Sequence, residues 1–141
     1  MKVIIFLDDK NGMLFNKRRQ SRDQAVTDEI CMLCQGKVLW MNDYSYPVYG
    51  NLKGVEIKCC QDFIQKAGTG EYALVETDDL KTHAENIEEL LVFRWNRSYP
   101  SDKKLGLDLS EWQCAEEKEF PGNSHEKITL EKYIKSQSHY V

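Results

Sequence analysis

The sequence predicts an α/β fold in three layers: a mixed, mostly parallel sheet with helices on both faces and a C-terminal antiparallel hairpin. Two observations indicate this class. Continuous apolar runs, which are typical of strands buried on both faces, alternate with helical patterns over the first two thirds of the chain. The last third instead contains two strand-like segments around a Pro-Gly turn. A length of 141 residues suits one core, so we expect residues 1–141 to form a single domain.

The first half of the chain alternates strand and helix. Residues 2–7 (KVIIFL) form an apolar, β-branched run that ends at two acids and an Asn-Gly pair, which indicates a buried central strand. Ser21 and Gln24 match a capping box, and apolar residues then recur at helical spacing up to a Gln-Gly pair. Residues 37–41 indicate a second buried strand, and residues 44–49 a short helix.

The second half is richer in strands. Five more segments have the composition of strands: 55–60, 71–76, 90–95, 112–118 and 127–134. Between two of them, the segment that starts at Thr77 or Asp78 predicts a helix with a thin apolar stripe. Residues 97–108 are polar and contain a proline and a glycine, which predicts a loop. The edges of the final hairpin permit a homodimer.

Composition and charge restrict the classes of partner. The net charge of −4 gives no overall attraction to nucleic acid or to an anionic membrane, so we expect neither as a partner. No apolar stretch approaches the roughly 20 residues that cross a bilayer, and the first run is too short for a signal peptide. We therefore expect a cytoplasmic protein. Five cysteines, an odd number, predict free thiols rather than a disulfide framework.

Several catalytic signatures are missing from the sequence. Three scattered histidines and cysteines without zinc spacing predict no metal site, which argues against a metal-dependent nuclease. No Gly-x-Ser-x-Gly motif of a serine hydrolase occurs. The Cys31-x-x-Cys34 pair falls at the end of a predicted helix, where the dipole opposes a thiolate, so we interpret Cys34 as a core residue.

Residues 12–23 (GMLFNKRRQSRD) concentrate basic side chains just before the first predicted helix. Unsatisfied N–H groups and the helix dipole favour an anion there, and arginine suits a phosphate or carboxylate. The candidate ligand-binding residues are Phe15, Asn16, Arg18, Arg19, Gln20 and Arg22. Two alternatives remain open: a solvated charged surface paired with acidic residues, or a surface that docks an acidic partner protein.

Asp23 is the candidate catalytic residue. A carboxylate at a helix start is commonly a residue that complements the dipole. If an apolar lid of Met13, Leu14 and Phe15 covers it, its pKa is raised, and it can donate a proton or hold the amino group of a heterocycle.

The order of these segments resembles that of dihydrofolate reductase. GMLFN and Asp23 are similar to the family's first loop and to the acid that serves the pterin. WMNDYS (residues 40–45) falls where the family's second strand enters a helix, and residues 73–95 have the length and rhythm of its later strand, helix and strand. The closing hairpin is also similar. The resemblance implies the reductase fold over most of the chain and a ligand site near residues 13–23.

The departures from the family concern its cofactor. Asn42, Asp43 and Tyr44 stand where the family contacts cofactor phosphates, and Glu76-Thr77 replaces its Gly-Gly. The cofactor is therefore unknown, and standard NADPH binding is not expected. We interpret the chain as a binder of a small anionic or heterocyclic ligand, nucleotide-like or pterin-like, at residues 13–23. The alternatives are a non-catalytic interaction protein with a basic docking loop, and a divergent NAD(P)H-dependent reductase.

Overall fold

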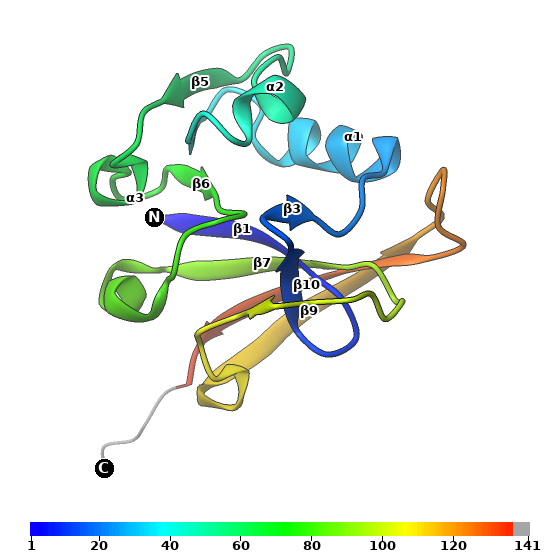
Figure 1. The fold of residues 1–141 in the computed structure, drawn as a ribbon. Coiled ribbons are helices and arrows are strands. Elements are labelled where there is room, and N and C mark those ends of the chain that lie inside the picture. The colour runs from blue at the N-terminus through cyan, green and yellow to red at the C-terminus, as the bar shows by residue number, and fades with distance from the viewer. Residues whose placement is uncertain (137–141) are drawn as a thin grey trace.

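A seven-stranded mixed sheet forms the centre of the computed structural model, which describes residues 1–136 (Figure 1). The strands lie in the order β5 (Glu56–Cys59), β4 (Val38–Met41), β6 (Tyr72–Leu74), β1 (Lys2–Leu7), β7 (Glu89–Arg94), β10 (Ile128–Lys135) and β9 (Trp112–Phe120). The first five are parallel, and β10 runs antiparallel to both of its neighbours, β7 and β9. This arrangement confirms the mixed, mostly parallel sheet with a C-terminal hairpin.

The central strand β1 is buried on both faces, as its continuous apolar sequence predicts. Ile4 lies opposite Leu74 of β6 and Leu91 of β7 in parallel register. Alternate side chains enter two separate cores, with Ile4 and Phe6 in one and the odd-numbered residues of β1 in the other.

Helices cover both faces of the sheet. The α1 helix (Gln24–Leu33) and the short α2 helix (Tyr46–Tyr49) pack into the core that contains Ile4. The α3 helix (Phe63–Lys66) packs into the opposite core, and the 3-10 helix η1 (Lys81–Asn86) follows β6 near that core (Figure 1). The three layers are those that the sequence predicts.

A small second sheet stands at the carboxyl end of β1. Its strands lie in the order β3 (Arg18–Arg19), β2 (Gly12–Phe15) and β8 (Lys103–Lys104). Asn16 and Lys17 join β2 to β3 with φ values of 51° and 61°, the conformation of a two-residue hairpin turn. The buried Asp8 carboxylate accepts the N–H of Gly12 at 2.7 Å, which fixes this β2–β3 hairpin to the end of β1.

Three local expectations are wrong. The helix expected after Thr77 is only the 3-10 segment η1, because its apolar stripe reduces to the flanking Leu80 and Ile87. Asp23 caps α1 in place of Ser21 by accepting the N–H of Ala25 at 2.9 Å. The polar loop 97–108 contains the strand β8, which pairs with β2.

No helix within residues 1–136 is long and apolar enough to span a membrane.

Candidate functional site

The carboxyl ends of β1, β6 and β7 meet beneath the β2–β3 hairpin. Open α/β sheets bind ligands at this edge, where successive connections leave on opposite faces. The crevice is lined by Phe6, Met13, Arg19, Gln20, Ser21, Val75, Glu76 and Trp95. It encloses about 10 Å³, enough for about one water molecule. The hairpin therefore closes this edge of the sheet.

A buried ion pair holds the hairpin in this position. Arg19 donates from Nε to Glu76 Oε2 at 2.9 Å and from Nη2 to Oε1 at 3.0 Å, and the Glu76 side chain is only 3 % exposed. Ser45 Oγ donates to the same carboxylate at 2.8 Å. The Arg19 guanidinium lies 4.6 Å from the centre of the Tyr44 ring. The hydrogen bonds to Glu76 raise the pKa of Arg19. Arg19, a candidate ligand-binding residue, is thus occupied inside the protein.

A larger open cavity lies beside the β2–β3 hairpin. Its volume is about 560 Å³, and its lining residues are Phe15, Asn16, Arg18, Arg19, Gln20, Tyr99 and Pro100. We call it the hairpin cavity. The first five of these residues are candidates from the sequence, and Arg22 is the candidate that does not line it. Phe15 is 41 % exposed, so part of its ring is open to solvent at this cavity. The Arg18 side chain forms no ion pair or hydrogen bond with residues 1–136.

Gln20 borders both the closed crevice and the hairpin cavity. Its Nε2 donates to Asp8 Oδ2 at 3.2 Å and to the Pro100 carbonyl at 3.3 Å, which fixes the orientation of the amide. Its Oε1 is the only buried side-chain oxygen or nitrogen within residues 1–136 that has no hydrogen-bond partner. A buried acceptor without a donor is costly, so Oε1 offers a hydrogen-bonding position to a ligand or water.

Asp23 lies beneath the turn that joins β9 to β10 rather than under the expected lid of Met13, Leu14 and Phe15. Its carboxylate accepts hydrogen bonds from five groups: the N–H of Ala25, Asn123 and Ser124, the Ser124 hydroxyl, and His125 Nδ1. Burial by itself raises the pKa of Asp23, but these hydrogen bonds outweigh burial and lower it. The expectation of a raised pKa is therefore wrong, because Asp23 is ionised and cannot serve as a proton donor at neutral pH.

His125 is the site residue that sequence reasoning missed. Its Nδ1 lies 2.9 Å from Asp23 Oδ2, and the two side chains are 1 % and 0 % exposed. Its Nε2 lies 3.0 Å from both Ser21 Oγ and the Tyr99 hydroxyl, and its ring stacks on Trp95. Because His125 follows Asp23 by 102 residues, no local motif reveals the contact.

The start of α1 already carries an anion of its own. The Asp23 side chain caps the helix, and Arg22 precedes it as an exposed residue. The basic side chains expected around this helix start do not gather there, because Arg18 and Arg19 lie on β3. The cations and the helix N-terminus therefore do not form one anion site.

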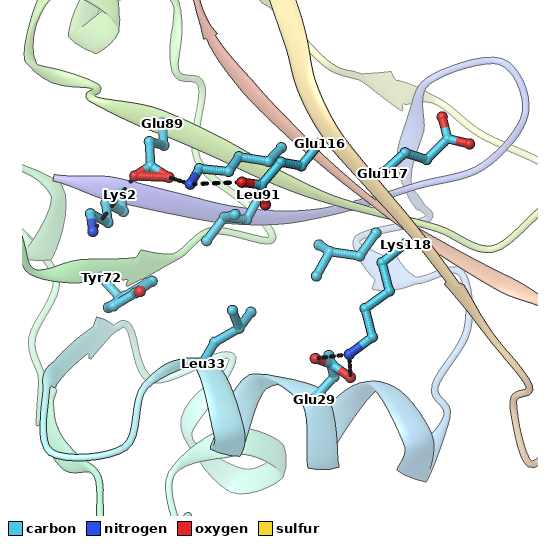
Figure 2. Close-up of a pocket in the computed structure, with 11 residues that line it drawn as sticks. Lys2, Glu29, Leu33, Tyr72, Glu89, Leu91, Glu116, Glu117 and Lys118 are labelled. Carbon is cyan, nitrogen blue, oxygen red and sulfur yellow. Dashed lines mark hydrogen bonds and ion pairs between the residues drawn. The ribbon is translucent and has the colours of Figure 1, made fainter.

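A second cavity, of about 300 Å³, lies between α1 and the strands β7, β9 and β10 (Figure 2). Leu33 and Leu91 line it, but most of its charged side chains neutralise one another. Lys118 contacts Glu29 at 2.9 Å, and Lys132 Nζ lies 3.1 Å from Glu89. This pairing leaves little charge for a ligand, so we regard the hairpin cavity as the better candidate.

The cysteines and acidic residues form no metal site within residues 1–136. All five cysteines are free thiols, as expected. Cys34 is fully buried in the core beneath α1, and burial raises the pKa of its thiol to about 12. A thiol in that environment packs as an apolar side chain and is a poor nucleophile.

Comparison with known proteins supports the fold. No family model and no curated protein sequence matches the chain. Among solved structures, the chain is similar to a dihydrofolate reductase from Enterococcus faecalis in complex with NADP(H) and RAB-propyl. The TM-score is 0.67 at 10 % sequence identity, and the match covers 96 % of each chain. The chain therefore has a dihydrofolate reductase-like fold, as the sequence resemblance implies.

Proposed function

We propose that this protein binds a small ligand in the hairpin cavity, and that the ligand combines an anionic group with a planar heterocyclic ring. The observation that carries the proposal is that the Arg18 guanidinium, which has no partner within residues 1–136, and the exposed Phe15 ring line the same 560 Å³ cavity. A cavity of this volume suits a nucleotide-sized or pterin-sized molecule.

The lining residues supply the interactions that such a ligand needs. The Arg18 guanidinium can bind a phosphate or carboxylate through two parallel hydrogen bonds. The Phe15 ring offers an apolar face on which a heterocycle can stack. Gln20 also lines the cavity, and its buried Oε1 has no donor within residues 1–136, so a ring amino group or N–H that reaches it would satisfy this acceptor. These properties favour a heterocyclic anion over inorganic phosphate alone.

We further propose that the ligand is not NADPH bound in the standard way. The solved reductase binds NADP(H), but here the corresponding groups are engaged within the protein. The Asn42 side chain accepts the N–H groups of Tyr44 and Ser45 at 3.1 and 3.3 Å, which removes donors from the start of α2. The buried Glu76 carboxylate is paired with Arg19, so neither its side chain nor this guanidinium is free to contact a pyrophosphate.

Thermal shift and calorimetry on the full chain test the proposal with five probes: AMP, folate, NADPH, inorganic phosphate and a short single-stranded RNA. A ligand at 100 times its Kd stabilises the fold by roughly 2.7 kcal/mol. We expect AMP or folate to bind, Arg18→Ala to weaken that binding at least tenfold, and Lys37→Ala, which removes an exposed cation elsewhere, to leave it unchanged.

Three results would overturn the proposal. Binding that is insensitive to Arg18→Ala places the ligand elsewhere. Binding of NADPH alone favours the divergent reductase. No binding of any probe favours a protein that docks an acidic partner.

A further inference from the structure

We propose that Ser21, His125 and Asp23 form a nucleophilic triad that cleaves small carboxylic esters. Ser21 Oγ lies 3.0 Å from His125 Nε2, and His125 Nδ1 lies 2.9 Å from Asp23 Oδ2. Nucleophile, base and orienting carboxylate thus stand in the order and at the distances that activate a serine. Such a triad is recognised by its geometry, and it occurs on unrelated folds without a shared motif.

Asp23 determines which nitrogen of His125 acts as the base. Its ionised carboxylate accepts the Nδ1 proton, so the neutral ring presents an unprotonated Nε2 toward Ser21. The same carboxylate stabilises the imidazolium that forms when Nε2 takes a proton. Asp23 is therefore a positioning residue, whereas Ser21 and His125 contact the reacting atoms.

Ser21 lies where a substrate can reach it. The residue is partly exposed, in the loop between β3 and α1, and one side of it borders the closed crevice of about 10 Å³. Because that crevice holds about one water molecule, both the acyl group and the leaving group approach Ser21 from its solvent-exposed side. The backbone N–H groups of Ser21 and Arg22 donate no hydrogen bond to residues 1–136, so they are available to a developing oxyanion.

The reaction proceeds in two steps. Ser21 Oγ attacks the carbonyl carbon while its proton passes to His125 Nε2, and the C–O bond to the leaving group then breaks as Nε2 returns the proton to the departing alcohol. A water molecule attacks the acyl-serine in the second step. His125 takes the proton of this water and returns it to Ser21 Oγ, which releases a carboxylic acid.

Tyr99 competes with Ser21 for the base. Its hydroxyl also lies 3.0 Å from His125 Nε2, and it stands 3.5 Å from Ser21 Oγ. The neutral Nε2 has one lone pair, so only one of the two hydroxyls donates to it at a time. We expect Tyr99→Phe to raise the rate of acylation at Ser21 about twofold or more, because it removes the competing donor.

Labelling of the full chain tests the proposal. The protein is treated with a neutral alkyl fluorophosphonate, and separately with p-nitrophenyl acetate, and the modified residue is mapped by mass spectrometry. We expect the fluorophosphonate to give a single adduct on Ser21 that is lost in Ser21→Ala and retained in Ser110→Ala, which removes an exposed serine elsewhere. We expect p-nitrophenyl acetate to acylate Ser21 faster than it acylates lysine amines or the exposed Cys59 and Cys114 thiols. No adduct on Ser21 of the folded protein would overturn the triad. Both probes are neutral, so failure here leaves the anion-binding proposal standing.

Substitutions of His125 and Asp23 separate catalysis from structural support. In variants whose circular dichroism shows the native fold, we expect His125→Gln to slow acylation at least about 100-fold. The ionisable side chains that contact the ring are Asp23 at Nδ1 and Tyr99 at Nε2. We expect Asp23→Asn to slow acylation about tenfold or more while the ester concentration that gives half the maximal rate stays unchanged, because Nδ1 loses the acceptor that orients the ring. Unchanged acylation in folded His125→Gln would show that the contact is only structural.

Discussion

Removing the charge of Arg19 should destabilise the protein by leaving Glu76 buried without its partner. Arg19→Met keeps an unbranched side chain of similar length on the Tyr44 ring and removes both hydrogen bonds to the carboxylate. Loss of one partner of a buried pair costs about 3–5 kcal/mol. Arg19 is 21 % exposed and Ser45 still donates to Glu76, so we expect the lower end, about 3 kcal/mol.

Urea unfolding, followed by tryptophan fluorescence, measures this loss. For a chain of this length, about 3 kcal/mol corresponds to a fall in Tm of roughly 10 °C. The control is the double variant Arg19→Met/Glu76→Met, which leaves no buried charge. We expect it to lose at least about 2 kcal/mol less than the sum of the two single variants. A coupling energy below about 0.5 kcal/mol would refute the view that this pair fastens the hairpin.

Two further predictions concern the turn between β9 and β10. The pKa of Asp23 is lower in the folded state than its unfolded value of about 3.9, so its stabilising effect is complete at pH 7 and is lost progressively as the pH falls through about 4 toward the folded-state pKa. Asp23→Asn should therefore reduce stability at pH 7 and flatten the acid limb in urea unfolding from pH 7 to pH 2, and an unchanged acid limb would contradict this. In Gly122→Ala the new Cβ would lie 2.7 Å from both Asp23 Oδ2 and the His125 carbonyl oxygen, so we expect the free energy of unfolding to fall by about 1–3 kcal/mol in the same assay. Gly68→Ala, in which the nearest atom to the new Cβ lies at 3.4 Å, serves as the control. Equal losses of stability in the two variants would contradict the reasoning.

The sequence predicts the sheet well because strand composition is a local property. The apolar run KVIIFL needs no knowledge of its partners to be identified as a strand buried on both faces. The helix expected after Thr77 is wrong because its packing depends on residues distant in the sequence. Its few apolar positions do not reveal that little of the core lies next to this segment. At the start of α1, both Ser21 and Asp23 are good capping residues, and donors from the distant turn at Asn123 and Ser124 hold Asp23 in place.

The candidate site is predictable only where it is contiguous in sequence. Five residues that line the hairpin cavity come from the continuous segment 15–20, so a single basic segment indicates them together. Tyr99 and Pro100 complete the wall from a loop that pairs with the hairpin only in three dimensions. Arg19 and Glu76 are 57 residues apart in the sequence, so no local pattern shows that the Arg19 guanidinium is already paired within the protein.

The central position of β1 has a consequence for how the chain folds as it is made. Among residues 1–136, the strand partners of residues 2–7 are residues 72–74 and 89–94, so this apolar segment leaves the ribosome long before either partner strand is made. At a synthesis rate of about 5–20 residues per second, the synthesis of β7 is completed roughly 4–17 s after that of β1. During that interval an uncovered strand of this composition can pair with other chains. We therefore expect the yield of folded protein to depend on what shields residues 2–7 during synthesis.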